Sequence, residues 1–151
     1  MKIKFFISAM ILGFVLIGLV QVTKASGYKA NYATKTVKIG KSEYKVSNGR
    51  IIRRKNGKTK VMVKKASDWF ITNGKYIYYA TGGKNWGIYN KLYRYNIKTK
   101  KSKYIFKVAK YNYIGVYGKK GQSIYYRVYG EGGSGIKFYA YDLKKRRKIR
   151  Q

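Results

Sequence analysis

The sequence predicts an all-β protein built from antiparallel four-stranded repeats. Its composition favours strands, because 18 tyrosines occur in a chain that has no proline, while 17 glycines can serve the turns. After residue 26 no stretch shows the period of an amphipathic helix. Two blocks of sequence recur at nearly the same offset, which indicates an internal repeat.

Residues 1–25 differ from the rest of the chain and predict an export signal that forms a helix. Lys2 and Lys4 precede the apolar run 5–20, and a short polar stretch ends at Ala25, before Ser26. This order is typical of a bacterial signal peptide cleaved between Ala25 and Ser26. The predicted localisation is secretion or attachment to the cell surface. The alternative is an N-terminal membrane anchor, because about 17 to 25 apolar residues can span a bilayer.

The repeat is clearest in two blocks: 77–79 recurs as 124–126, and 92–98 recurs as 138–144. A short segment, 26–43, precedes the main repeat region at 44–151. Each unit is expected to contain four short strands. In the unit 67–110 they lie near 69–72, 76–81, 91–97 and 103–108, and in the unit 111–151 near 113–117, 123–129, 136–143 and 147–150.

A degraded copy of the repeat occupies about 36–66. Strands near 50–54 and 60–63 flank a turn at 55–58, and shortened first strands are expected near 36–39 and 44–46. In the unit 67–110 the first turn is expected at Asn73-Gly74, and in the unit 111–151 the segment 118–121 is expected to link the first two strands. Asn96 and Asp142 end the third strands, where their side chains can bond to the backbone of the following turn.

The strand 76–81 is apolar on both faces, since Tyr76, Tyr78 and Ala80 alternate with Ile77 and Tyr79. Such a strand belongs to a sheet that is covered on both sides. Four-stranded units of about 40 to 50 residues that pack face to face are typical of β-propeller blades.

The chain resembles bacterial exported propeller repeats of the TolB type and of the low-density-lipoprotein-receptor type. The residues that carry this resemblance are Ile77-Tyr78-Tyr79-Ala80, Ile124-Tyr125-Tyr126, Leu92-Tyr93-Arg94-Tyr95-Asn96 and Phe138-Tyr139-Ala140-Tyr141-Asp142. The segment 78–81 reads Tyr-Tyr-Ala-Thr where the receptor type has Tyr-Trp-Thr-Asp. The resemblance implies propeller-like blades, which are known mainly as structural and interaction modules.

The number of repeats is too small for a closed ring. Propellers normally close with about four to eight blades, whereas this chain has two and a half to three repeats. The expectation is therefore an incomplete or open propeller. Three explanations stay open: a fragment of a longer gene, a ring completed by further copies of the chain, or an open stack of sheets.

The charge of the chain is strongly positive, with 36 Lys and Arg against 4 Asp and Glu, a formal net charge of +32. Such an excess attracts polyanions: nucleic acid, anionic lipid, or the phosphate-rich polymers of a cell wall. The alternative is a compositional surplus of lysine on a solvated surface.

Two basic clusters are the candidate polyanion-binding residues. They are Lys98, Lys100, Lys101 and Lys103 in one unit, and Lys144, Lys145, Arg146, Arg147 and Lys148 in the next. Because both clusters surround the turn after the third strand, we expect them to align along one rim of adjacent sheets. A row of cations can hold an anionic polymer with salt-sensitive affinity. The alternative is that solvated lysines simply collect at turns.

Catalysis and metal binding are not expected. The chain has no histidine to act as a general base or ligand and no cysteine to supply a thiolate or a disulfide. The four acids, Glu43, Asp68, Glu131 and Asp142, fall in separate repeats or connections. We therefore predict no catalytic residue, no metal and no cofactor.

The sequence thus predicts an exported, noncatalytic interaction module that binds anionic cell-envelope polymers through a basic rim. Its expected partners are an anionic polymer or membrane surface, with homo-oligomerisation as a way to cover exposed sheet faces. Nucleic-acid binding through exposed tyrosines and Trp86 is one alternative. The others are a cationic membrane-active protein and a remnant of a longer propeller protein without separate activity.

Overall fold

Three antiparallel sheets follow one another along the chain. The computed structural model describes residues 28–31, 36–82, 89–130 and 135–150, and in these residues every regular element is a β-strand. The all-β, antiparallel prediction is confirmed. The expected signal helix, with Ala25 and Ser26, lies outside the described residues, as does Trp86.

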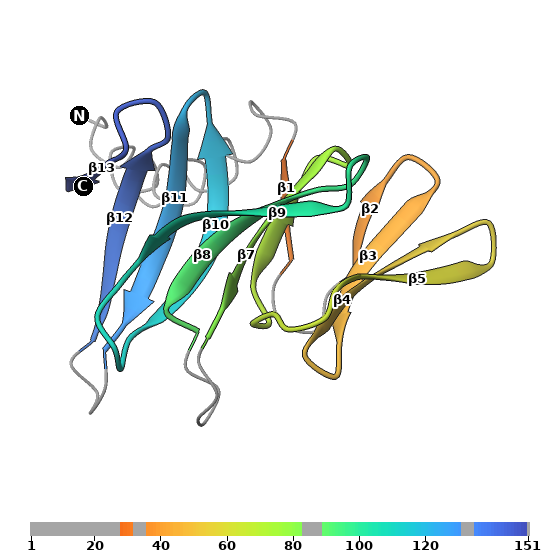
Figure 1. Cartoon of the computed structure of the whole chain (residues 1–151), viewed down its shortest axis with the longest axis horizontal. Coiled ribbons are helices and arrows are strands. Elements are labelled where there is room, and N and C mark those ends of the chain that lie inside the picture. The colour runs from red at the N-terminus through yellow and green to blue at the C-terminus, as the bar shows by residue number, and fades with distance from the viewer. Residues whose placement is uncertain (1–27, 32–35, 83–88, 131–134, 151) are drawn as a thin grey trace, which may run out of the picture.

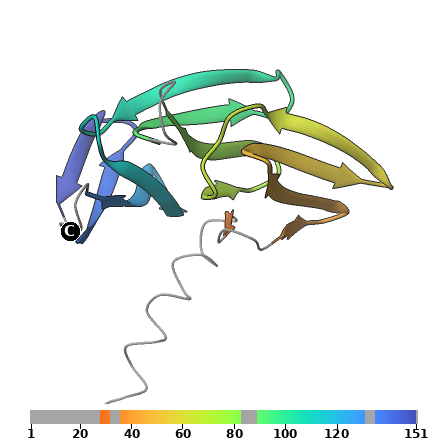
Figure 2. The ribbon, with the colours of Figure 1, turned by 90° about the horizontal axis from the view of Figure 1, so that it is seen from below.

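The sheets are named here by their order in the chain. The first sheet has the strand order β2 (Val37–Ile39), β3 (Ser42–Ser47), β4 (Arg50–Lys55) and β5 (Lys58–Val63). The middle sheet has the order β1 (Lys29–Ala30), β6 (Phe70–Thr72), β7 (Tyr76–Thr81), β8 (Lys91–Asn96) and β9 (Lys101–Lys107). The last sheet has the order β10 (Tyr113–Lys120), β11 (Ser123–Tyr129), β12 (Ile136–Asp142) and β13 (Arg147–Arg150). Figure 1 shows the green middle sheet standing between the orange-to-yellow first sheet and the blue last sheet, and Figure 2 shows the same order from below.

Several strands differ from their predicted extents: β5 and β9 each begin two residues earlier than expected, at Lys58 and Lys101, and β10 and β3 are longer. β10 does not end before Gly118 but continues to Lys120, because a bulge at Tyr117 lets Gly118 pair with Tyr125. The expected link 118–121 is therefore wrong. The turn between β10 and β11 is shorter and begins at Gly121, which has a φ of 52°. β3 is not shortened either, because it pairs with β4 along its whole length.

β7, in the middle sheet, is buried on both faces, as the sequence predicts for 76–81. Alternate residues of β7 enter two separate cores, which is the consequence of the two-residue period of a strand. The core toward the last sheet includes Tyr78, Ala80, Ile114, Val116, Ile124 and Tyr126, and the core toward the first sheet includes Ile77, Tyr79, Val37, Tyr44, Ile51 and Met62. The sheets are thus held together by layers of side chains on either side of β7.

β1 is a strand that the sequence did not predict. It extends the middle sheet by pairing with β6, and it also contacts β2 and β10, the first strands of the other two sheets. Asn31, fully buried, fixes this position: its backbone N–H donates to the carbonyl of Phe70 at 3.0 Å, and its Oδ1 accepts from the Phe70 N–H at 2.9 Å. Part of the expected segment 26–43 therefore joins the first strands of all three sheets.

The double burial of β7 predicts a large cost for truncating one of its inward residues. Ile77→Ala is expected to lower the free energy of unfolding by about 2–5 kcal/mol, because Ile77 is 0% exposed and a cavity would remain. Val61→Ala, at a position 43% exposed, is the control and should change stability by less than about 1 kcal/mol. Urea unfolding measures both; equal effects would contradict the placement of Ile77.

Burial of tyrosine also predicts alkaline destabilisation. Burial is the largest cause that raises the pKa of Tyr28, Tyr78 and Tyr126 above the ordinary tyrosine value. Above about pH 10 the unfolded chain releases protons that the native protein keeps, so the free energy of unfolding falls with rising pH. Urea titrations at a series of alkaline pH values are expected to show this fall, with a shallower slope in Tyr126→Phe. An unchanged slope in that variant would contradict the account.

Candidate anion-binding cleft

The turn after the third strand has the same construction in the middle and last sheets. Asn96 Oδ1 accepts hydrogen bonds from the backbone N–H groups of the residues two and three positions later, at 3.0 and 3.2 Å. Asp142 Oδ1 does the same in the last sheet, at 2.8 and 2.9 Å. The predicted turn role of Asn96 and Asp142 is confirmed. The Lys145 N–H, followed by that of Lys144, holds the pKa of Asp142 below its usual value.

A basic residue closes each of these turns in a left-handed conformation. Lys100 has a φ of 57° and Arg146 a φ of 53°. In the first sheet the corresponding β4–β5 turn uses Asn56 and Gly57, with φ values of 49° and 74°. Left-handed backbone is unfavourable for residues with a Cβ, and asparagine and glycine tolerate it best. Lys100 and Arg146 therefore occupy positions that local propensity does not favour.

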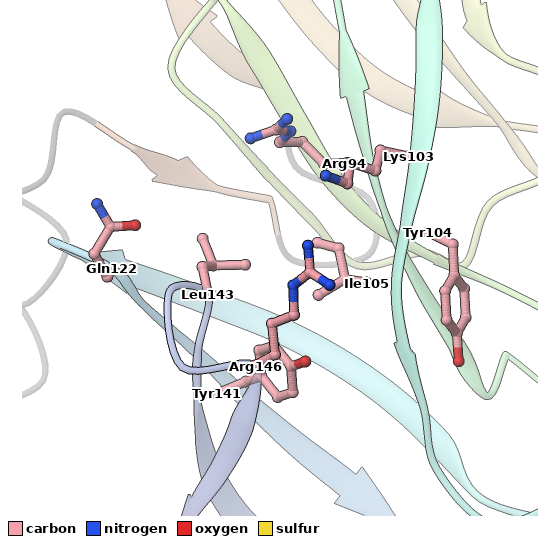
Figure 3. Close-up of a pocket in the computed structure, with 8 residues that line it drawn as sticks. All are labelled: Arg94, Lys103, Tyr104, Ile105, Gln122, Tyr141, Leu143 and Arg146. Atoms are coloured by element: carbon pink, nitrogen blue, oxygen red, sulfur yellow. The ribbon is translucent and has the colours of Figure 1, made fainter.

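A cleft of about 430 Å³ lies between the middle and last sheets. The residues that line it come from β8, β9 and the last sheet: Arg94, Lys103, Tyr104, Ile105, Gln122, Tyr141, Leu143 and Arg146. In Figure 3 Arg94 and Lys103 lie on the side of the middle sheet, while Gln122, Leu143 and Arg146 approach from the last sheet. Two sheets that pack against each other thus leave an opening with cations on both sides.

The cations of the middle sheet form one cross-strand row. Tyr78 is paired with Arg94, and Arg94 is paired with Lys103, so all three side chains lie on the face toward the last sheet. Burial raises the pKa of Tyr78, and the guanidinium of Arg94 beside its hydroxyl opposes this effect. Like charges directly opposite each other destabilise a sheet. The pair Arg94 and Lys103 therefore has an electrostatic cost that a bound anion would remove.

Arg146 adds a third cation from the opposite side of the cleft. None of the eight lining residues is acidic, and the nearby carboxylate of Asp142 is engaged by the turn backbone. Burial, and then the charge of Arg94, lower the pKa of Lys119 on the neighbouring strand β10. The cleft is accordingly a site of positive potential, in which Arg94 is half-buried and Lys103 and Arg146 are exposed.

Aromatic packing fixes the two sheets beside the cleft. The ring of Phe106 on β9 lies 4.5 Å from that of Tyr141 and 4.8 Å from that of Tyr126, both in the last sheet. Ring pairs at this separation stabilise a contact beyond the area that they bury. Because Tyr141 also lines the cleft, this packing sets the distance between its two walls.

The structure brings only part of the predicted basic rim to this cleft. Lys103 and Arg146 line it. Seven predicted residues lie elsewhere: Lys98, Lys100, Lys101, Lys144, Lys145, Arg147 and Lys148 are exposed and are not among the lining residues. Lys148 instead places its Nζ 3.4 Å from the centre of the Tyr139 ring.

Arg94 is the cleft-lining cation that the sequence interpretation missed. It occupies the centre of Leu92-Tyr93-Arg94-Tyr95, a strand that was expected to pack between sheets. A charge at such a position requires a partner or a ligand. The equivalent residue in the next unit is Ala140, so the departure of Arg94 from its own repeat was the available signal.

Other kinds of site are not found in the part of the chain that the structure describes. That part contains no cluster of three or more His, Cys, Asp or Glu residues that could hold a metal ion. It also contains no helix of the length and apolarity that crossing a membrane requires. The chain matches no protein-family model, and no curated protein or solved structure is significantly similar to it.

The left-handed conformation of Lys100 allows its charge to be removed without loss of stability. Lys100→Gly is expected to leave the free energy of unfolding unchanged or to raise it by up to about 1 kcal/mol, because glycine accepts a φ of 57°. Lys101→Gly, at the first residue of β9, is expected to lower stability by about 0.5–1 kcal/mol. Equal losses in the two variants, measured by urea unfolding, would contradict the turn geometry.

Proposed function

We propose that the protein is an exported, noncatalytic binding module that holds an anionic cell-envelope polymer in the cleft between its middle and last sheets. One observation carries the proposal: Arg94 and Lys103 are directly paired like charges, Arg146 faces them, and no carboxylate lines the cleft. Two guanidinium groups and an ammonium suit phosphate or carboxylate groups, because guanidinium can donate two parallel hydrogen bonds to either.

A polymer fits the surroundings of the cleft better than a small anion does. Exposed cations continue beyond it on the β8–β9 turn, at Lys98 and Lys100, and on the β12–β13 turn, at Lys144 and Lys145. A flexible polyanion can contact these cations in succession and release its counterions, which a single small ion cannot do. The cleft would then supply the closest contacts and the turns a weaker, salt-sensitive contribution.

We further propose that the three sheets are blades of an open propeller. Each has four consecutive antiparallel strands in chain order, and their first strands, β2, β6 and β10, all contact β1. Export, with cleavage after Ala25, is supported by the order of basic, apolar and small residues in 1–25. A noncatalytic role is supported by a cleft lining without histidine, cysteine or carboxylate.

Nucleic-acid binding is less well supported than binding of a cell-envelope polymer. Base stacking requires exposed rings, but Tyr78 and Tyr126 are each 2% exposed and pack between sheets. Tyr79 and Tyr95 are also buried, on the other face of the middle sheet. The tyrosines of β7 therefore contribute to the cores and offer bases little surface, and Tyr104, 47% exposed, is the exposed ring of the cleft lining.

Removing two cleft cations tests the proposal. Arg94→Gln combined with Arg146→Gln is expected to weaken binding of long-chain inorganic polyphosphate roughly 100-fold or more, because hydrogen bonds to charged groups contribute about 1.5–3 kcal/mol each. Isothermal titration calorimetry of the purified protein at two salt concentrations measures this loss together with the salt dependence.

The matched control removes two arginines from the first sheet. Arg50→Gln combined with Arg54→Gln lowers the net charge equally at exposed positions outside the cleft, and binding is expected to weaken less than about threefold, as for screened surface charges. Equal losses in both double variants would show that net charge alone governs binding. Absence of polyphosphate binding by the wild-type protein at low salt would end the proposal.

A further inference from the structure

The outer face of the last sheet, turned away from the middle sheet, is apolar and exposed. In β11, Ile124, Tyr126 and Val128 enter the core, so the intervening residues point outward. Their cross-strand neighbours on β12 and β13 share this face, and Ile136, Phe138 and Ile149 are 49%, 51% and 40% exposed. An exposed apolar patch of this kind marks an interaction site.

Strand register arranges this face in three rows. The first row is Tyr113, Tyr129 and Ile136; the second is Gly115, Arg127 and Phe138; and the third is Gly118, Tyr125, Ala140 and Ile149. The bulge residue Tyr117 joins them, since its ring centre lies 6.0 Å from that of Phe138 and 6.3 Å from that of Tyr125. The face is therefore a continuous surface of rings and aliphatic groups.

Arg127 is the single charged residue in these three rows, and its guanidinium packs against aromatic rings. Its guanidinium lies 3.7 Å from the ring centre of Trp69 and 5.0 Å from that of Tyr129. The side chain crosses β10 at Gly115, where a Cβ would lie 3.1 Å from its Cγ and Nε. In a chain with 36 Lys and Arg, this face presents almost no cationic group to solvent.

Basic residues adjoin one end of the face. The next row is Lys120, Ser123, Asp142 and Arg147, and the turn beyond it contains the exposed Lys144 and Lys145. An apolar surface with tyrosines, bordered by cations, fits the boundary of an anionic bilayer, where aromatic rings lie at the headgroups and Lys and Arg contact the phosphates.

Two observations disfavour a second copy of the chain as the partner. Strands of about seven residues in a four-stranded sheet give a face of roughly 23 by 19 Å, so two copies would bury about 900 Å², less than the roughly 1,200 Å² of a stable interface. Two chains of net charge +32 also repel each other. An anionic bilayer, in contrast, is complementary to this charge.

The opposite end of the molecule shows that a terminal sheet face can be polar in this fold. On the outer face of the first sheet Lys38 pairs with Glu43 at 3.4 Å, and Glu43 lies opposite Arg54. Ile52 and Val61 form one apolar cross-strand pair there. The apolar outer face of the last sheet is therefore a particular feature of that sheet.

We propose that the outer face of the last sheet docks on an anionic lipid bilayer. Phe138, Ile136 and Ile149 enter the headgroup boundary, and Lys120 and Arg147, in the adjoining row, contact lipid phosphates. The site is separate from the cleft, whose lining residues belong to other faces. The protein would thus hold a polymer in the cleft while it rests on a membrane surface.

Co-sedimentation with sucrose-loaded vesicles tests this docking. The purified wild-type protein is expected to bind vesicles of phosphatidylglycerol and phosphatidylcholine more tightly than vesicles of phosphatidylcholine alone. Ile136→Ser combined with Phe138→Ser is expected to weaken binding to the anionic vesicles about tenfold or more, because two large apolar side chains no longer enter the boundary. Ile52→Ser combined with Val61→Ser, on the outer face of the first sheet, is the matched control and should bind like the wild type. All variants carry the same N-terminal residues, so a contribution of the run 5–20 cancels.

Polyphosphate binding separates this proposal from the proposed function. The Ile136→Ser, Phe138→Ser variant is expected to keep wild-type affinity for polyphosphate and an unchanged urea midpoint. If the stability of this double variant falls, Ile149→Ser on the edge strand β13 serves as a second test variant. It is expected to bind anionic vesicles more weakly than the wild type. If the wild-type protein binds anionic vesicles but not polyphosphate, the proposed function fails while the docking proposal stays supported by vesicle binding.

Three outcomes would overturn the docking proposal. The first is wild-type affinity of the Ile136→Ser, Phe138→Ser variant for anionic vesicles. The second is the loss of both vesicle binding and polyphosphate binding in that variant while its fold stays intact, because the two ligands would then share one surface. The third is a wild-type dimer, detected by light scattering across a concentration series, that this variant abolishes, since the face would then be a protein interface.

Discussion

β7 packs against a core on each of its faces, and the positions of the other two sheets depend on this double burial. Its alternating side chains commit Tyr78 and Ala80 to one core and Ile77 and Tyr79 to the other. Without cysteine, the chain has no disulfide to hold the sheets, so packing between layers must do so. β1 adds a second connection, because it contacts the first strand of every sheet. The cleft exists because both walls are fixed in this way.

Charge is distributed unevenly over this framework. Most cations lie on exposed turns and edges, where water screens them and where they discourage pairing between sheet edges. In the cleft, Arg94 is half-buried and is held opposite Lys103, which is itself exposed. The outer face of the last sheet withdraws its one guanidinium onto Trp69. The three environments differ in how far their cations are exposed to water, from the exposed turns to the half-buried Arg94 and Arg127.

The sequence predicts the strands of this fold well because short runs rich in tyrosine, isoleucine and valine are separated by turns that asparagine or glycine marks. It predicts the turn bonds of Asn96 and Asp142 because these depend only on neighbouring residues. It misses β1, whose two residues pair with β6 from far along the chain. It also misses Arg94, because the cleft depends on how two sheets pack, which local pattern does not determine. The same dependence on sheet packing explains why only Lys103 and Arg146, among the nine predicted cations, line the cleft.

Side-chain NMR of the arginines tests the central claim that the cleft is an anion site. The Nε–Hε signals of the wild-type protein would be followed during titration with inorganic tripolyphosphate at moderate salt. The account predicts saturable shifts for Arg94 and Arg146 and much smaller shifts for Arg50 and Arg54, which lie outside the cleft. Equal, unsaturable shifts at all four arginines would contradict it, because they would show that the ligand samples the whole basic surface.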